Sequence, residues 1–580
     1  MKKIIVLIIV IGLLLTTFIA SVDAHYSGNV SKSVSVIPYA TIYVDDNNTQ
    51  GPWDGTQQHP YRTIMDGVDN ASDGDTVFVF NGIYSDEHIY VRKSIKLVGE
   101  DKYNTIIYGP YFQVNKANGF ELHNFCFKHT QPIFLFDCSH CKISENIILD
   151  FFSGSGIALT NCSNCILSEN NIQAYHYGAC IWLRCFSVNN KIKDNYLCGC
   201  KIEGIDDTEG ICIEYDSNDT AVANNILSNF DGNGIDIAYS DRAIITDNVI
   251  NNTLYGLDFS FSANDTITGN KITNNSEGIT LDFSDDVTIY YNVVKENSFY
   301  GISLSDGKNI DVSRNIIDSN PCGIAFCFII NSICSNNTIT RSSENGIDIM
   351  DSGSIDSNIL VSYNDVNNCY CGIMLENSWG NTLKDNNVNF NEFGIMLYGA
   401  ANFNVVTKNE VGNNGVGVEL YGFIQGKTYA PFGNWVVGNN ISENTNCGIY
   451  STVLTLSNYL YYNNLIDNIQ NAYDKGTNIW YKFKLLGKSM GNYWDDYSGK
   501  DNNGDGIGDT PYKIPPLPFR NKDRYPCMEP IDIGNTASFY SELIQSNSQP
   551  SSQPGSQSNP SPQNQQGSQS SSPVAKTTNR

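Results

Sequence analysis

Histidine and positive charge are both scarce in this 580-residue chain. All seven histidines lie at or before His176, so the rest of the chain has no histidine that could act as a general base. Only 17% of the residues are charged, and 35 Lys and Arg face 61 Asp and Glu, which gives a net charge of −26. Because such a chain repels phosphates, we expect no nucleic-acid partner, and the balance favours cations or neutral polymers.

Motifs of several enzyme classes are also missing. No phosphate-binding loop, nucleotide fingerprint or Ser-His-Asp order stands out from chance. The only long apolar run is Ile4 to Ile19, within residues 1–24. Lys2 and Lys3 precede it, and a cleavage point after Ala24 follows it. This pattern predicts a secretory signal peptide, with an uncleaved membrane anchor as the alternative. We therefore expect a secreted, periplasmic or cell-surface protein with no membrane span in the mature chain.

A repeat of about 22 residues dominates the rest of the sequence. Gly234, Gly256, Gly278 and Gly301 each open a segment with Ile or Leu, at intervals of 22, 22 and 23 residues. An Asn-x-Ile, Asn-x-Val or Asn-x-Leu step recurs once in each segment. It is found at Asn146, Asn170, Asn195, Asn224, Asn248, Asn270, Asn292, Asn315, Asn337, Asn364, Asn386, Asn409, Asn439 and Asn463. A fixed period of this size is typical of a repeat architecture.

The repeat predicts an all-β fold, a right-handed parallel β-helix with coils of about 22–24 residues. Apolar residues alternate with a period of two, as at Ile235 and Ile237, which excludes a helical solenoid and predicts inward-pointing side chains. We expect the repeated Asn to adopt a left-handed backbone and its amide to bond the Asn of the next coil. The longer intervals, 195–224, 337–364 and 409–439, predict loops that leave the coil.

The chain divides into five predicted segments. The signal peptide is followed by a spacer at 25–38 and by the β-helix at 39–477, whose N-terminal cap includes a short amphipathic helix at 63–71. Strands are expected at 41–44, 76–80, 89–91 and 95–98. The aromatic-rich segment 478–531 is predicted to form a C-terminal cap with an acidic Gly-rich loop. Residues 532–580 are rich in Ser, Gln and Pro, and we expect them to be disordered.

Three stretches make the chain similar to the NosD-like family of right-handed parallel β-helix proteins. The first is the opening TIYVDD…GPWDGTQQHPYRTIMDGVDNASDGDTVFVF, the second is the series of Gly-Ile and Asn-x-Ile coils, and the third is GNYWDDYSGKDNNGDGIGDTPYKIP. Together they cover residues 41 to about 530. The resemblance implies an exported archaeal or bacterial surface protein of the periplasmic copper-binding or carbohydrate-binding and sugar-hydrolysis type. It does not identify an activity, because one β-helix fold supports many functions.

The acidic Gly-rich loop contains the strongest local motif. Asp501, Asn503, Asp505 and Asp509 place oxygen ligands at alternate positions, and Gly506 follows the third of them. This spacing predicts a calcium-binding loop, although position twelve is Tyr512 where an EF-hand has Glu. The alternative is a solvated acidic turn.

An acidic strip is predicted on the outside of the coils. Counted from the Gly of each coil, the second and fourth residues should point outward, which places Glu214, Asp236, Asp258 and Asp282 on one face, with Asp348 and Glu376 further along. Asp236 and Asp258 occupy the same position of adjacent coils and should be about 5 Å apart. Such pairs can carry out glycosidic acid/base chemistry, and the proximity of like charges should raise a pKa. No Lys, Arg or His is patterned beside them, so solvated surface, carbohydrate binding and catalysis all stay open.

A cysteine cluster is the third candidate site. Cys138-x2-Cys141 and Cys162-x2-Cys165 have the spacing of a zinc site, and His140 adds a donor. The two pairs are also separated by 24 residues, one coil, so stacked apolar packing or a cross-coil disulfide would explain them equally well. Copper or zinc here is the alternative to calcium as a cofactor.

These features lead to three functional hypotheses. The first is an exported surface protein that binds a polysaccharide or cell-envelope glycan, or serves as a rigid adhesive rod, without catalysis. The second is a polysaccharide lyase or glycoside hydrolase that uses the acidic strip, with Asp236, Asp258 and Asp282 as catalytic candidates. The third is a periplasmic protein that handles copper.

Overall fold

The computed structural model describes residues 39–535, except 86–87, 110, 152–153, 176–177, 201–207, 351–356, 483–488 and 517–520. The predicted signal peptide with its cleavage point at Ala24, the spacer and nearly all of the predicted tail lie outside these residues. The chain divides into two compact units between Ser378 and Trp379. In the described part of the chain, no helix is both long and apolar enough to cross a membrane.

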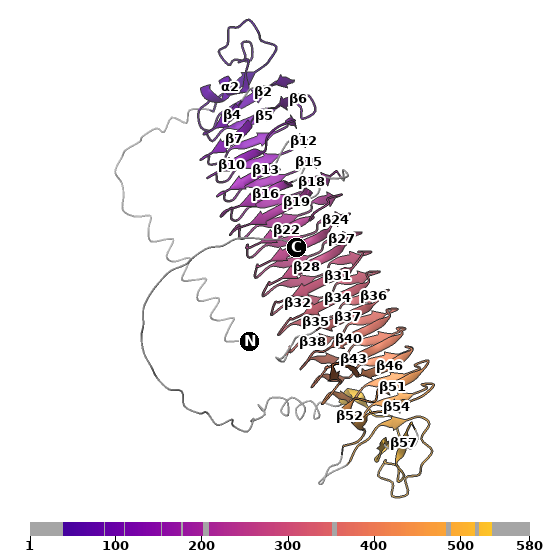
Figure 1. Ribbon diagram of the computed structural model, residues 1–580. Helices are drawn as coiled ribbons and strands as arrows, with labels where there is room; N and C mark the ends of the chain where they lie inside the picture. Colours follow the sequence, from indigo (N-terminus) through magenta and orange to yellow (C-terminus); the bar gives the residue numbers. More distant parts are fainter. Residues whose placement is uncertain are drawn as a thin grey trace, which may run out of the picture. The chain divides into compact units, whose positions relative to one another are not determined.

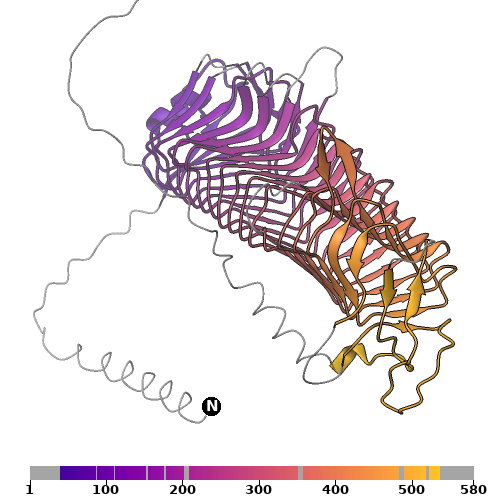
Figure 2. The ribbon, with the colours of Figure 1, turned by 60° about the horizontal axis from the view of Figure 1, so that its bottom comes forward.

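Each coil of unit 1 contributes one strand to each of three parallel sheets. One coil contains β22 (Ile235–Ala238), β23 (Ile244–Thr246) and β24 (Val249–Asn251). The next coil repeats them as β25 (Tyr255–Ser260), β26 (Thr266–Thr268) and β27 (Lys271–Thr273), and each strand pairs in parallel with its predecessor. The coils of this unit, coloured indigo to magenta, stack with their turns aligned (Figures 1 and 2). The predicted parallel β-helix is confirmed.

One sheet has the longest strands and is called the long-strand sheet below. In unit 1 it consists of β4 (His88–Val91), β7 (Tyr111–Asn115), β10 (Ile133–Phe136), β13 (Gly154–Thr160), β16 (Gly178–Arg184), β19 (Thr208–Glu214), β22, β25, β28 (Glu277–Asp282), β31 (Tyr300–Ser305), β34 (Cys322–Cys327), β37 (Asn345–Met350) and β40 (Cys371–Glu376). Ile235, Ile237, Leu257 and Phe259 are fully buried, as their alternation predicts.

The N-terminal cap has the predicted helix and strands. Helix α2 (Ile64–Asn70) begins after Thr63, whose hydroxyl accepts a hydrogen bond from the backbone N–H of Asp66 and so satisfies a helix N-terminal donor. Ile64 and Val68 are buried. The four predicted strands are found as β1 (Thr41–Val44), β2 (Thr76–Val79), β4 and β5 (Lys96–Gly99), with boundaries that differ by one residue at most.

Asparagines form a buried ladder through the coils of unit 1. The Asn270 amide Nδ2 donates to Oδ1 of Asn292 at 3.0 Å and to the carbonyl oxygen of Ile245 at 2.9 Å. Its Oδ1 in turn accepts from both the backbone N and Nδ2 of Asn248, each at 3.0 Å. The predicted bond between asparagines of successive coils is therefore confirmed.

Two details of that prediction are wrong. The ladder passes from Asn195 to Asn225, which lie 2.9 Å apart between Nδ2 and Oδ1, whereas the predicted member Asn224 is exposed. The left-handed residue is the one before the ladder asparagine: Asn224 has φ 56°, and Asp247, which precedes Asn248, has φ 55°. The turn therefore places its left-handed residue outside the coil and leaves the next asparagine in a backbone conformation that points its amide inward.

Asn270→Ala is expected to destabilise unit 1 by about 2–5 kcal/mol, because it removes one amide and leaves several buried donors and acceptors without partners. Urea unfolding monitored by circular dichroism would measure the loss. Lys271→Ala is the matched control, since Lys271 is the exposed next residue. Equal stability of the two variants would contradict a structural role of the ladder.

Unit 2 continues the same coil pattern. Its long-strand sheet contains β43 (Phe393–Tyr398), β46 (Val416–Tyr421), β51 (Cys447–Ser451) and β54 (Ala472–Asp474). The long interval 409–439 contains an antiparallel hairpin, β47 (Phe423–Gln425) and β48 (Lys427–Tyr429), so an insertion is confirmed there. The other two long intervals include residues outside the described part. Coil pairing also extends past the predicted boundary at 477, because β56 (Tyr493–Trp494) pairs with β53 (Asn464–Ile466).

Candidate functional site

The outer surface of the long-strand sheet concentrates carboxyl groups on four adjacent coils of unit 1. We call this surface the acidic face and define it by Glu209, Glu214, Asp236, Asp258, Glu277 and Asp282. Asp236 lies between the buried Ile235 and Ile237 of β22, and Asp258 lies between the buried Leu257 and Phe259 of β25, so both carboxyl groups point outward.

A glycine kink brings further carboxyl groups onto the same surface. A Cβ atom at Gly278 would lie 2.3 Å from the carbonyl oxygen of Gly301 and 2.5 Å from Cγ1 of Val294, so this position faces the coil interior and accepts only glycine. The residue before it, Glu277, consequently shares the outer surface with Thr280, whose hydroxyl donates to Glu277 Oε2 at 3.2 Å.

The strand register confirms the predicted arrangement of the acidic strip. Asp236 is the direct register partner of Asp258. Asp282 is the partner of Ser260 and so lies diagonally from Asp258. Glu214 is the partner of Ala238 and lies diagonally from Asp236 on the other side.

The two central carboxyl groups both have raised pKa values. Burial raises the pKa of Asp236 to about 8, with further contributions from the carboxylates of Glu209, Asp258 and Glu214. Burial also raises the pKa of Asp258, to about 6, while a hydrogen bond from Asn233 Nδ2 at 3.2 Å opposes the shift. Like charges contribute as predicted, but burial is the larger cause. At pH 7 Asp236 is mostly protonated and Asp258 mostly ionised.

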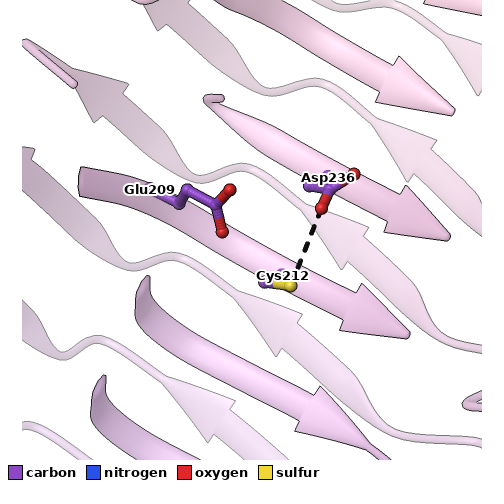
Figure 3. Close-up of side chains that lie close together, drawn as sticks. All are labelled: Glu209, Cys212 and Asp236. Atoms are coloured by element: carbon purple, nitrogen blue, oxygen red, sulfur yellow. Dashed lines mark hydrogen bonds between the residues drawn. The ribbon is translucent and has the colours of Figure 1, made fainter. Parts of the chain in front are cut away.

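Glu209, Cys212 and Asp236 form a compact group within the acidic face. Their ligand atoms all lie within 4.8 Å of one another, and no other described group of three His, Cys, Asp or Glu side chains is this compact. Figure 3 shows Glu209 and Cys212 on one strand, facing Asp236 on the next, with the Cys212 thiol donating to Asp236 Oδ2 at 3.8 Å. The sequence analysis did not identify Glu209 or Cys212 as site residues, although Glu209 precedes the Gly of its coil just as Glu277 does.

Aromatic side chains border the acidic face along one edge. Tyr215, Tyr239, Phe261 and Phe283 each follow directly after a strand of the long-strand sheet, and we call them the aromatic strip. Their ring centroids are 6.1, 4.9 and 4.9 Å apart, and successive rings are parallel within 5°. Each side chain is about half exposed, at 48–53%. Sequence reasoning missed the strip, although each member lies five residues after the Gly of its coil.

The side chains of Trp182 and Arg184 lie at one end of this surface. Trp182 in β16 donates its indole N–H to Glu214 Oε1 at 2.9 Å. The guanidinium of Arg184 lies 4.3 Å from the centroid of the Trp182 ring. Arg184 also donates from Nε to Thr160 Oγ1 at 3.2 Å, and it is a single residue that does not recur at the same position of the following coils.

The predicted cysteine cluster faces the coil interior. Cys138, Cys141, Cys162 and Cys165 are at most 2% exposed. None of the seventeen cysteines, all of them in the described part, forms a disulfide. His140 is exposed and its Nδ1 lies 3.1 Å from Asn118 Oδ1, so the structure does not bring it to the four sulfur atoms.

The predicted calcium loop is compact and exposed. Asp501 Oδ1 and Oδ2 accept hydrogen bonds from the backbone N–H groups of Gly504 and Gly506 at 2.7 and 2.8 Å. Asn503, Asp505 and Asp509 make similar bonds within the loop, at 2.8–2.9 Å. The oxygen ligands thus belong to one ordered turn, and calcium binding there stays a prediction.

Comparison with known families gives two matches. Residues 68–253 and 328–499 match the model described as periplasmic copper-binding protein (NosD), and residues 209–359 match the right-handed β-helix region. No curated protein matches the chain at a significant level.

Solved structures that match the chain include a mannuronic acid-specific polysaccharide lyase from human gut microbiota, at 12% identity over 56% of this chain and 86% of that one, with a TM-score of 0.40. PfbA, a surface adhesin of Streptococcus pneumoniae, is 16% identical over 57% and 90%, with a TM-score of 0.38. An α-1,3-glucanase of Streptomyces thermodiastaticus is 12% identical over 64% and 69%, with a TM-score of 0.37.

Copper is a poor fit to the Glu209, Cys212 and Asp236 group. Two of the three donors are carboxylates, which suit hard cations, and the group contains no imidazole. Burial and the neighbouring carboxylates raise the pKa of the Cys212 thiol well above its usual range, so the sulfur stays protonated. This group is better suited to proton transfer and hydrogen bonding than to a soft metal ion.

Proposed function

The chain belongs to the NosD family of right-handed parallel β-helix proteins, and from this premise we propose that it is an exported protein that binds a polysaccharide along the acidic face and the aromatic strip of unit 1. The observation that carries the proposal is the alignment of four stacked aromatic rings with six carboxyl groups on the same coils. Half-exposed rings offer apolar contact to sugar C–H groups, and carboxyl groups accept bonds from sugar hydroxyls.

Two further features support a neutral, extended polymer as the ligand. The net charge of −26 and the carboxyl groups of this surface repel polyanions. Both the strip and the acidic face repeat once per coil, at about 4.8 Å, so they suit a ligand that is itself a linear repeat. Export rests on the predicted signal peptide and on the periplasmic description of the family model.

Tyr239→Ala is expected to weaken polysaccharide binding about tenfold or more, because it interrupts the aromatic strip at its second ring. Binding to an array of neutral and anionic polysaccharides, followed by calorimetry on the retained ligand, would measure the effect. Tyr363→Ala is the control, since Tyr363 has a similar backbone conformation (φ 57°) and exposure (58%) and is not in the strip. Equal loss in both variants, or binding of anionic polymers alone, would contradict the proposal.

Hydrolysis of the bound polymer is a second candidate function, favoured by the pKa values of about 8 and 6 at Asp236 and Asp258. The protonated Asp236 would donate its proton to the glycosidic oxygen as that bond breaks. The ionised Asp258 would attack the anomeric carbon, and water would then hydrolyse the glycosyl ester, with Asp236 taking the proton from the water. Adjacent coils are about 4.8 Å apart, which favours this retaining geometry over one that leaves room for a water.

A further inference from the structure

Unit 2 has an aromatic surface of its own, on the outer side of its long-strand sheet. The strands β43, β46, β51 and β54 are neighbours in this sheet (Figure 1). Isoleucine, leucine and valine side chains of these strands are buried in the coil, so the residues that alternate with them point outward. The outward residues are Met396, Tyr398, Glu419, Tyr421, Tyr450 and Tyr473.

The four tyrosines form two separate stacks. Tyr398 and Tyr421 are register partners, and their rings lie 5.4 Å apart between centroids and within 6° of parallel. Tyr450 and Tyr473 are arranged in the same way, at 5.7 Å and 4°. Lys475 holds the second stack, because its Nζ donates to Tyr450 Oη at 2.8 Å and lies 5.3 and 5.2 Å from the two ring centroids.

An insertion fixes the first stack. The hairpin β47–β48 interrupts the coil repeat directly after Tyr421, and its Phe423 ring lies 5.0 Å from the Tyr398 ring. Tyr429, on the other strand of the hairpin, stacks on Phe423 at 5.2 Å and 17°. Insertions that leave a regular scaffold are where binding residues concentrate in repeat proteins, and this one places two more aromatic rings beside the sheet.

The two stacks end on adjacent coils. Tyr421 is 39% exposed, and among the described residues only the Tyr398 ring stacks on it. Tyr450 is partly exposed and stacks, within the same described part, on Tyr473 alone. Each terminal ring therefore has one face that no other aromatic ring covers.

A buried carboxyl group lies next to both terminal rings. Glu419 is the register partner of Tyr450 and precedes Tyr421 by two residues on β46, and it is only 6% exposed. No described residue forms a hydrogen bond or an ion pair with it, and burial is the sole cause of its raised pKa. Neither carboxyl oxygen is among the fully enclosed atoms without a partner, so both can be reached from the surface. Such a group is costly unless a ligand donates hydrogen bonds to it.

We propose that Glu419, Tyr421 and Tyr450 form a carbohydrate site that binds one neutral oligosaccharide on unit 2, independently of the acidic face. Sugar hydroxyls would donate to the carboxyl group, and the C–H groups of the sugar ring would contact the uncovered ring faces. A quaternary ammonium ligand would need rings arranged around it as a cage, whereas these rings are parallel within each stack. The site does not depend on the function proposed for unit 1.

The test is calorimetry of the full chain with neutral hexasaccharides of glucose, mannose and N-acetylglucosamine. Tyr239→Ala, which interrupts the aromatic strip of unit 1, is the parent for every variant. We expect the parent to bind one hexasaccharide of this panel per chain. Adding Tyr421→Ala or Glu419→Leu should weaken that binding about tenfold or more. Glu419→Leu should be at least as stable as the parent in urea at pH 7, because it removes a buried polar group that has no partner.

Phe432→Ala is the matched control, since Phe432 lies in unit 2 with the same exposure as Tyr421, 39%, but outside the long-strand sheet. It should leave the affinity unchanged. The proposal is overturned if the parent binds no hexasaccharide of the panel, if Tyr421→Ala and Glu419→Leu bind as the parent does, or if Phe432→Ala causes an equal loss. A Glu419→Leu variant that is less stable than the parent would show a structural role and also overturn it. The unit 1 proposal fails or holds on a different comparison, that of Tyr239→Ala with the wild type on polysaccharides.

Discussion

Asp258→Asn is expected to lower the rate of polysaccharide hydrolysis by about 10²–10⁴-fold while polysaccharide affinity changes little. The amide keeps the shape and hydrogen-bonding capacity of the side chain but cannot act as a nucleophile. Asp236→Asn should have an effect of similar size, because the amide cannot donate a proton to the leaving oxygen. Reducing-sugar release from the polymer identified by the binding array would measure both rates.

Asp282→Asn is the matched control for these variants. Asp282 lies on the same surface but diagonally from Asp258, so its loss should change the rate by only a few fold. The pH dependence gives an independent check, since activity requires Asp236 protonated and Asp258 ionised and should therefore peak between about pH 6 and 8. If no retained polymer is cleaved, or if both Asn variants cleave at the wild-type rate, hydrolysis is excluded and binding alone remains.

Stability is expected to fall by several kcal/mol as the pH rises from about 5 to 8. Burial raises the pKa of Asp265 in unit 1 and of Glu419 in unit 2 to about 7 each, and these side chains are 1% and 6% exposed. Because both pKa values are higher in the folded than in the unfolded chain, the folded state binds more protons in this range. The stabilisation is present below the unfolded pKa values near 4 and is lost as the pH passes the folded values.

Urea unfolding at pH 5 and pH 8 would measure this dependence. Asp265→Asn and Glu419→Gln should each reduce the difference in unfolding free energy between pH 5 and pH 8, by at most roughly 3–4 kcal/mol. Asp286→Asn is the control, because it removes an exposed carboxyl group from the corresponding turn of the next coil, and it should leave the slope unchanged. A protein that is more stable at pH 8 than at pH 5 would contradict the proposed burial of these groups.

The fold was predictable because its main determinants are periodic. The spacing of Gly234, Gly256 and Gly278 defines the coil, and the alternation of Ile235 and Ile237 defines which side chains point inward. The ladder asparagine was misplaced at 224 because Asn224 and Asn225 both fit an Asn-x-apolar pattern. Only the turn geometry distinguishes the exposed left-handed residue from the buried one.

The candidate sites could be predicted only where their residues occupy the same position in successive coils. Asp236 and Asp258 share one offset from Gly, so their pairing followed from the period. Cys212 has the same offset from Gly as Asp236, but it is not a carboxylic acid and was therefore not considered with the acidic strip. Glu209 precedes the Gly of its coil, so its approach to Asp236 could be seen only in the structure. The extent of burial at Asp236 could not be predicted, because it depends on enclosure by neighbouring side chains, which no spacing encodes.

The asparagine ladder has a consequence for how such a chain can change. Each ladder asparagine bonds only groups of its own coil and of the coils directly before and after it. Gaining or losing one whole coil would therefore restore every bond at the junction, whereas gaining or losing one residue would break the ladder. Duplication of a coil would then lengthen the row of acidic and aromatic side chains by one step while leaving the existing steps in place. The length of the binding surface can thus change without a change in the types of side chain that form it.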